Sequence, residues 1–337
     1  MIAHNRPTLG SEEHAATTRV LASGWVAQGS EVEAFERELC DFFNLPGGHA
    51  VVVSSGSAAL YLALWALDGK NKKIGFPVYS CAALRNAVGL IGGQSVYLDC
   101  KGGGVNVDTE AALACSLDVL IAPSIFGIPV ALPVAPNYKI IEDLAQSIGA
   151  KVRGERIGLR GEVGICSFYA TKMMTTGGQG GAVISRDKAL IDAVRDFREF
   201  DCRDDDKLRF NFQMTDLQAA VGRVQLNRLP EFIENREKWF AIYQSAGLDL
   251  LDDNSDGVEP VRYRMVMRCD EPSRVISVLA SAGIKAIVPI ETGELLDHPA
   301  RHPVAAVLSK TTVSLPAYPG LGEDVVSRIA RIAKGAS

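Results

Sequence analysis

The sequence has 337 residues, of which 47% are hydrophobic and 22% are charged, and its formal net charge is −5. These are the proportions of an ordinary globular protein, and the length allows about two domains. Charges of both signs are mixed along the chain, so there is no basic footprint of the kind that binds nucleic acid. The longest apolar run, Ala58–Leu67, is too short to cross a bilayer. The first residues, MIAHNRPTLGSEEH, contain no apolar signal core, and we therefore expect a cytoplasmic protein with no membrane partner.

Cysteine and histidine positions argue against several kinds of site. The seven cysteines contain no CxxC pair, and such a scattered, odd set is typical of reduced thiols. The five histidines stand at 4, 14, 49, 298 and 302. This leaves little material for a histidine-based zinc site or a Ser-His-Asp triad in the middle of the chain. We expect no metal.

The first part of the chain is predicted to alternate strands and helices. Two helices with a serine in capping position open it, and β-branched or apolar runs then alternate with helical patterns. This alternation predicts a mostly parallel sheet that is covered on both faces. The predicted helices are 11–23, 30–43, 54–67, 81–91, 108–115 and 188–200, and the predicted strands are 49–53, 74–76, 95–99, 119–122, 138–141, 163–168 and 182–185.

The last hundred residues have a different pattern. A polar turn at 201–207 precedes two predicted long helices, and a mixture of strands and helices follows. We therefore place a domain boundary near residue 235, with a large domain over 1–235 and a small one over 236–337. The elements predicted here are helices 214–226, 230–245, 272–282 and 322–333, and strands 263–268 and 285–289.

A lysine and an acid follow two of the predicted parallel strands. Lys172 lies on the turn after the strand 163–168, and Asp143 comes at the end of the strand 138–141. Open α/β sheets bind their ligands at the carboxyl ends of such strands. Pyridoxal phosphate needs this pair, because a lysine binds its aldehyde and a carboxylate keeps its pyridine nitrogen protonated. Taken alone, Lys172 could be a solvated surface charge, and Asp143 could be a helix N-cap.

The turn SSGSAAL (54–60) offers a phosphate site. It joins a strand to a helix, and the free N–H groups and dipole at a helix start favour a phosphate group. A simple N-cap is the plainer interpretation of such a serine. Ser167, five residues before Lys172, adds a second hydroxyl. The argument depends on the order of the signals: phosphate turn, then acid, then Ser-x4-Lys.

With these motifs in this order, the sequence resembles the DegT/DnrJ/StrS family of aminotransferases, which depend on pyridoxal phosphate (PLP). The resemblance runs from about residue 9 to 333. The segments that carry it are LASGWVAQGSEVEAFE (21–36), SSGSAAL (54–60), FPVYSCAA (76–83), IFG (125–127), IEDLAQSIGA (141–150), GEVGICSFYATK (161–172), GGQGGAVIS (177–185), FNFQMTDLQAAVGRVQLNRL (210–229) and SLPAYPGL (314–321).

The resemblance implies an α/β fold of the aspartate-aminotransferase type, fold type I. That fold has a large domain around a mostly parallel sheet and a smaller C-terminal α/β domain. It further implies that Lys172 is the Schiff-base lysine, that Asp143 pairs with the pyridine nitrogen and that Gln146 contacts the phenolic oxygen. The phosphate would be held by residues of the turn and of the strand before Lys172, and by one residue from the other subunit of a homodimer: Gly56, Ser57, Ser167 and, across the dimer, Asn211.

The sequence also departs from the family pattern. Cys81 stands where an aromatic residue usually stacks on the cofactor ring, Met173 replaces an asparagine, and Gln179 replaces a glutamate. The implied activity is transfer of an amino group from a donor, glutamate by family habit, to a keto acceptor such as a nucleotide-linked keto sugar. Two alternatives stay open: another PLP reaction, such as dehydration or epimerisation, and a non-catalytic regulatory protein that binds PLP.

Overall fold

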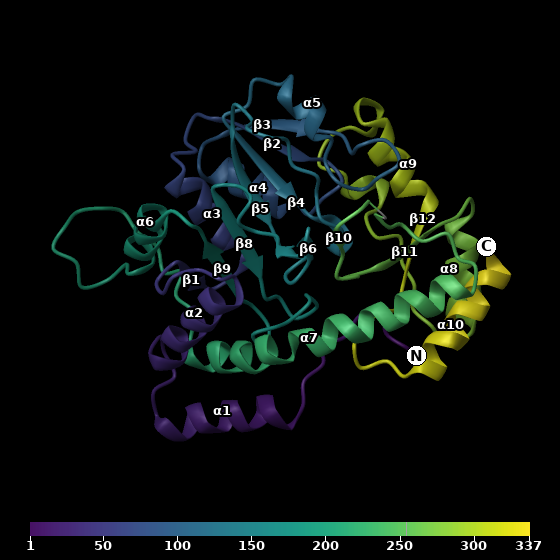
Figure 1. Ribbon diagram of the computed structural model, residues 1–337, viewed down its shortest axis with the longest axis horizontal. Helices are drawn as coiled ribbons and strands as arrows, with labels where there is room; N and C mark the ends of the chain where they lie inside the picture. Colours follow the sequence, from purple (N-terminus) through teal and green to yellow (C-terminus); the bar gives the residue numbers. More distant parts are fainter. Residues whose placement is uncertain (254) are drawn as a thin grey trace.

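The computed structural model describes residues 1–253 and 255–337, and it has an α/β architecture (Figure 1). Its main sheet has seven strands in the order β1-β9-β8-β5-β4-β2-β3. β9 runs antiparallel to both of its neighbours, and the other pairs are parallel, as predicted. The strands are β1 (Ala50–Val53), β2 (Lys73–Pro77), β3 (Gln94–Leu98), β4 (Val119–Pro123), β5 (Lys139–Asp143), β8 (Val163–Ser167) and β9 (Gly181–Ile184).

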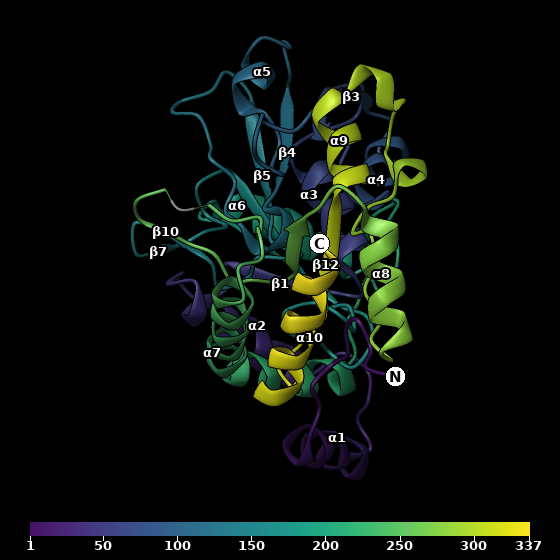
Figure 2. The same cartoon turned by 90° about the vertical axis from the view of Figure 1, so that its right-hand side faces the viewer.

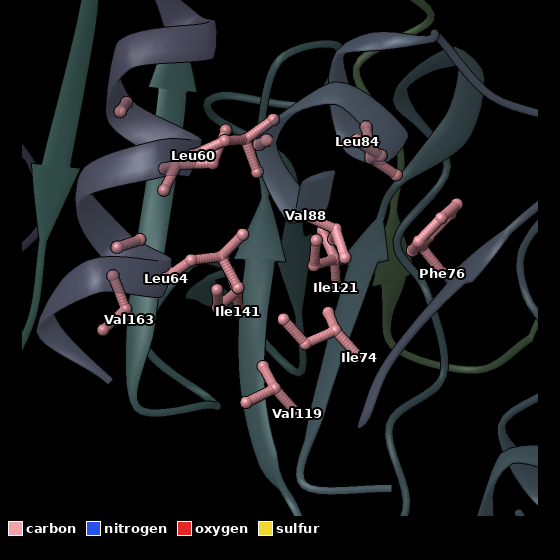
Figure 3. Packing of buried hydrophobic residues seen from close by; sticks show 14 of the residues in the cluster. Leu60, Leu64, Ile74, Phe76, Leu84, Val88, Val119, Ile121, Ile141 and Val163 are labelled. Carbon is pink, nitrogen blue, oxygen red and sulfur yellow. The ribbon is translucent and has the colours of Figure 1, made fainter. Parts of the chain in front are cut away.

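Helices cover both faces of this sheet. On one face Leu60 and Leu64 of α3 pack with Ile141 and Val163 of the strands beneath them (Figure 3). On the other face Phe35 of α2 belongs to a second buried cluster. Because both faces are buried, the strands are continuous apolar runs rather than alternating ones. The helices of this part are α1 (Ser11–Ser23), α2 (Ser30–Phe42), α3 (Gly56–Ala66), α4 (Ala83–Leu90), α5 (Thr109–Leu113) and α6 (Lys188–Arg198).

The capping of α2 differs from the prediction. Ser30 is the first helical residue, and Gly29 takes the N-cap position without a side-chain cap. The carboxylate of Asp216, at the start of α7, accepts hydrogen bonds from the N–H groups of Gly29 at 2.8 Å and Val32 at 3.1 Å. A distant acid therefore satisfies the N–H groups that a serine was expected to cap.

One helix, α7 (Asp216–Ser245), replaces the two helices that were predicted over 214–226 and 230–245. Pro230 lies inside it, although proline lacks the N–H that an interior helical position needs. The helix buries Leu229 against the core of the large sheet and Tyr243 in the core of the C-terminal part. This packing at both ends offsets the missing hydrogen bond.

The C-terminal part is built around a two-stranded antiparallel sheet. Figure 2 shows its helices grouped around β12. The strand predicted over 285–289 is wrong: in this segment only a single bridge, from Ile287 to Ser314, is formed, and Ile284 just before it bridges to Ile2. The elements are β11 (Met265–Arg268), β12 (Thr312–Leu315), α8 (Pro272–Ser281), α9 (Pro303–Thr311) and α10 (Glu323–Ala336). A separate small sheet joins β10 (Val258–Glu259) to β6 (Lys151–Val152) and β7 (Glu155–Arg156) of the large part.

We propose that the domain boundary lies within α7 near residue 235. Ile233 packs with the core of the large part, whereas Trp239 belongs to the core of the C-terminal part, so the buried contacts change between these two residues. The N-terminal Ile2 also packs with the C-terminal core. Among the described residues, no helix is long and apolar enough to span a membrane.

Candidate active site

A cavity of about 740 Å³ opens where the large sheet faces the C-terminal part. Its walls combine the carboxyl ends of β5 and β8, the start of α3, the loop before α4 and residues around the start of β11. Seven of the eight site residues expected from the sequence line it: Gly56, Ser57, Cys81, Asp143, Gln146, Ser167 and Lys172. Asn211 is not among the described residues that line it.

Asp143 is the last residue of β5 and is 5% exposed. The parallel register pairs it with Ile165 of β8, so the ends of both strands meet at the cavity. Its Oδ1 accepts a hydrogen bond from the N–H of Ala145 at 2.8 Å. Burial raises the pKa of this carboxyl, while the charge of Lys172 acts in the opposite direction. A buried acid of this kind gains from a cationic partner.

Lys172 lies on the turn that follows β8. The turn is tied locally by its own N–H, which donates to the carbonyl of Tyr169 at 2.9 Å. Asn5 of the N-terminal segment donates to the carbonyl of Thr171 at 2.9 Å and so holds the preceding peptide. The Lys172 ammonium lies 5.6 Å from the centre of the Tyr263 ring. The lysine is thus held from three separate parts of the chain.

The helix start at 54–58 leaves a recess for a small anion. Ser55 is the N-cap of α3, and its Oγ accepts from the N–H of Ala58 at 3.1 Å. A Cβ on Gly56 would lie 2.7 Å from the Cβ of Ser167, so only glycine fits between this turn and β8. The N–H groups of the first helical turn and the Ser167 side chain therefore face a common space, as a phosphate site requires.

Gln146 is oriented by the backbone of the IFG segment. Its Oε1 accepts from the N–H of Phe126 at 2.7 Å, which leaves its NH2 group as a donor at the cavity wall. Phe126 adopts a left-handed conformation with φ of 57°, which is uncommon for a residue with a side chain. The uncommon backbone conformation thus lies at the residue whose N–H holds Gln146.

Two cavity residues, Tyr263 and Arg264, were missed by sequence reasoning. Burial on its own raises the pKa of Tyr263, but the charges of Lys172 and Arg264 outweigh it and the pKa is lowered. Arg236 of α7 is fully buried and donates to the backbone carbonyls of Tyr263 at 2.8 Å and Ala317 at 2.5 Å. The segment 263–268 was predicted only as a strand. The only feature of the sequence that could have indicated a site is that two polar residues, Tyr263 and Arg264, precede the apolar part of this strand.

Cys81 lines the cavity, whereas Asn211 does not. Cys81 is an exposed free thiol on the cavity wall before α4, so a small side chain stands at the position that the resemblance gives to an aromatic ring. Asn211 is exposed, and its Oδ1 accepts from the N–H of Gln213 at 3.0 Å. Its neighbour Phe212 bonds through its carbonyl to the N–H of Ser54. Asn211 thus lies near the turn before α3 but outside its own chain's cavity.

The model of the DegT/DnrJ/EryC1/StrS aminotransferase family matches residues 7–334. The chain belongs to this family. It is therefore a PLP-dependent aminotransferase, with the fold and cofactor that the motifs predicted.

This aminotransferase is similar to two curated relatives and to one solved structure. It is 29% identical to the erythromycin biosynthesis sensory transduction protein EryC1 of Saccharopolyspora erythraea, over 95% of this chain and 94% of the relative. It is 28% identical to a UDP-N-acetyl-3-dehydro-α-D-glucosamine 3-aminotransferase of Acidithiobacillus ferrooxidans, over 90% and 88%. A protein described as a sugar aminotransferase, Spr1654 of Streptococcus pneumoniae, superposes with a TM-score of 0.90 over 99% of this chain and 96% of its own, at 21% identity. That last likeness concerns the fold.

The cavity of this aminotransferase fits PLP. The glycine-only recess at Gly56 provides room and N–H donors for a phosphate group. The buried carboxyl of Asp143 lacks a cationic partner within hydrogen-bonding distance among the described residues. Gln146 offers NH2 donors, and Lys172 lies on the same wall. PLP is a phosphorylated pyridine aldehyde. It requires a recess for its phosphate, an acid for its ring nitrogen, a donor for its phenolic oxygen and an amine for its aldehyde, and the cavity has all four.

Proposed function

We propose that this aminotransferase moves the amino group of an amino acid, glutamate, to the keto group of a nucleotide-linked sugar. The observation that carries the proposal is that Lys172, Asp143 and the α3 recess line one cavity in a chain of this family. The printed name of the A. ferrooxidans relative describes a keto sugar attached to UDP. A cavity of about 740 Å³ has room for a substrate beside the cofactor.

In this proposal, each residue has one task. Gly56, Ser57 and Ser167 bind the cofactor phosphate, and Gln146 donates to its phenolic oxygen. Bound PLP supplies an aldehyde for the amino group and a protonated ring that withdraws electrons. Asp143 holds the proton on the ring nitrogen, and its burial strengthens this ion pair. Lys172 then carries a proton at Nζ to and from the substrate carbon that bears the nitrogen.

The test is a coupled assay with purified protein, PLP and glutamate. We expect 2-oxoglutarate and an amino sugar of matching mass when a UDP-linked 3-keto sugar or a GDP-linked 4-keto sugar is the acceptor. The matched control is the same sugar without its nucleotide. Transfer to simple keto acids but to no keto sugar would refute the substrate class, and it would leave the aminotransferase activity intact.

We further propose a cytoplasmic homodimer with shared active sites, in which Asn211 reaches the phosphate of the partner's cofactor. Support comes from an exposed apolar surface formed by two loops: Trp25 is 62% exposed, Leu208 93% and Phe210 74%. The loops meet at Glu199, which accepts hydrogen bonds from Gln28 and Gln213. Large exposed apolar patches usually mark interaction sites.

Mixing two inactive variants tests the shared site. In a homodimer of this kind, Lys172→Ala and Asn211→Ala damage sites in different ways, so a mixed dimer keeps one site with both residues intact. We expect activity to reappear on mixing, up to about a quarter of the wild-type value if subunits exchange at random. Mixing Lys172→Ala with Ser167→Ala is the control and should restore less, because both lesions then lie on the cofactor-binding wall of one chain. Monomers in size-exclusion chromatography, or no recovery on mixing, would refute the shared site.

A further inference from the structure

Arg264 is a cation on the wall of the cavity that has no ion-pair partner among the residues that the structure describes. It lies just before β11, and it lines the same space as Lys172 and Asp143. Its buried Nη1 has no hydrogen-bond partner, and within residues 1–253 and 255–337 it forms no salt bridge. A buried donor of a guanidinium is costly to leave without an acceptor. The arrangement indicates an anion that the chain itself does not supply.

Neighbouring arginines show that this state is unusual here. Arg262, two residues earlier, pairs with Asp252 and with Glu237 at 3.2 Å. Arg236 donates its Nη1 to backbone carbonyls. Arg262, in the same short segment, has two carboxylate partners. Among the described residues Arg264 has none, and it is Arg264 that faces the cavity.

The acids that line the cavity do not serve Arg264. Asp143 is held by the Ala145 N–H on the opposite wall. Glu294 is exposed, and its Oε2 accepts from the N–H of Glu291 at 2.8 Å in a capping arrangement. Burial, and then the charge of Arg264, lowers the pKa of the neighbouring His4 to about 3, and a neutral imidazole supplies no negative charge to the guanidinium.

The place of Arg264 limits what the anion can be. The ring of Tyr263 has the Lys172 ammonium 5.6 Å and the Arg264 guanidinium 5.7 Å from its centre, so the two cations are at most about 11 Å apart. The cofactor phosphate has its own recess at Gly56, at the start of α3. The anion therefore lies beside the amine that handles the substrate nitrogen, and a planar guanidinium favours a planar carboxylate.

We propose that Arg264 binds a carboxylate of the amino-acid donor and so orients its amino group toward Lys172. This step rests on the proposed aminotransfer and names the residue that selects the donor. Both cations lie close to the centre of the Tyr263 ring, at 5.6 Å and 5.7 Å, and Arg236 fixes the backbone of Tyr263 by donating to its carbonyl at 2.8 Å. An amine without a carboxylate would lack this anchor.

The first test is binding of glutarate, a dicarboxylate without an amine, to the PLP-loaded protein by calorimetry. Replacing Arg264 with Gln should weaken glutarate binding about 10- to 100-fold, the usual effect of losing a charged hydrogen bond. Arg264→Lys should recover part of the loss, since it keeps the charge but not the two-pronged geometry. Arg262→Lys is the matched control and should bind glutarate as the wild type does. Circular dichroism and the PLP spectrum establish that each variant is folded and loaded.

The second test separates the donor from the acceptor. In single-turnover reactions, Arg264→Gln should raise the glutamate concentration needed for half-maximal rate more than it lowers the maximal rate. Its pyridoxamine form should react with the keto-sugar acceptor within about threefold of wild type. Equal glutarate affinity in Arg264→Gln and wild type, or a defect confined to the acceptor step, would overturn the inference. Arg264-dependent glutarate binding in a protein that transfers no amino group would refute the proposed function alone.

Discussion

The two walls of the cavity are built in opposite ways. On the large-domain wall, the polar groups are fixed by the backbone: Asp143 accepts from the Ala145 N–H, and Gln146 accepts from the Phe126 N–H. On the small-domain wall, Arg264 has a buried donor next to the ring of Tyr263 that finds no acceptor in the described part of the chain. A wall with satisfied groups suits a cofactor that stays, whereas an unpaired charge suits a substrate that enters and leaves. The contrast can be tested one residue at a time.

Loss of Lys172 should have the largest effect. Lys172→Ala removes both the amine that binds PLP and the group that moves the proton, and general acid–base catalysis alone contributes about 10²–10⁴-fold. We expect the rate of amino transfer to fall by at least about 10³-fold. Borohydride reduction followed by mass spectrometry should attach PLP to Lys172 in the wild type and to no residue in the variant. Lys188→Ala is the control, because Lys188 is an exposed partner of Asp192. A Lys172→Ala protein that still transaminates would contradict the assignment.

Two adjacent acids at the end of β5 give the next comparison. Asp143 faces the cavity, while the buried Glu142 pairs with Arg160 at 2.6 Å on the other side of the strand. Asp143→Asn should lower the rate about 10²–10³-fold, as expected for one removed electrostatic partner of the reacting group. Glu142→Gln should instead lower the free energy of unfolding by about 2–4 kcal/mol, somewhat less than the loss of a fully buried pair because Arg160 is partly exposed. If the two variants have the same profile, the distinction between the sites is wrong.

The same acid predicts a pH effect in the cofactor-free protein. Burial raises the pKa of Asp143, so above the ordinary pKa of an aspartate the folded state binds more protons than the unfolded state. Its contribution to stability must therefore fall as pH rises through that window. Asp143→Asn should make the cofactor-free protein more stable than wild type at pH 7, and the gain should shrink toward pH 4. Urea unfolding at several pH values measures it, and a variant that is less stable at every pH would disprove it.

The phosphate recess should be sensitive to a single methyl group. Gly56→Ala would put a Cβ 2.7 Å from that of Ser167, and such overpacking costs about 1–3 kcal/mol. We expect a lower melting temperature and PLP affinity reduced about tenfold or more. Gly89→Ala, in the last turn of α4 where a Cβ would meet no neighbour, is the matched control and should be neutral or stabilising by up to about 1 kcal/mol. Unchanged PLP affinity in Gly56→Ala would show that the phosphate binds elsewhere.

The two walls also differ in how far the sequence could predict them. Asp143, Ser167 and Lys172 follow from local patterns, because parallel strands place their carboxyl ends at one edge of the sheet. Tyr263 and Arg264 reach the same cavity through the packing of a second core, and no local pattern states where that core docks. The continuity of α7 through Pro230 was missed for a related reason: the contacts that stabilise it come from both cores. The helix cap supplied by Asp216 is likewise a long-range contact.

An effect on stability alone should come from His4, which bonds to β12 of the C-terminal part. Its Nε2 lies 2.8 Å from Ser314 Oγ, and burial, with the charges of Arg264 and Lys285, lowers its pKa to about 3. As pH falls below 6.5, His4 binds a proton in the unfolded state but not in the folded state. The free energy of unfolding therefore declines by up to ~1.4 kcal/mol per pH unit. His4→Asn should flatten the loss of stability between pH 6 and 4, whereas Ser314→Ala, which keeps the buried ring, should not. An unchanged slope in His4→Asn would mean that the cations of this wall do not act on His4, and it would weaken the case that Arg264 lacks a partner.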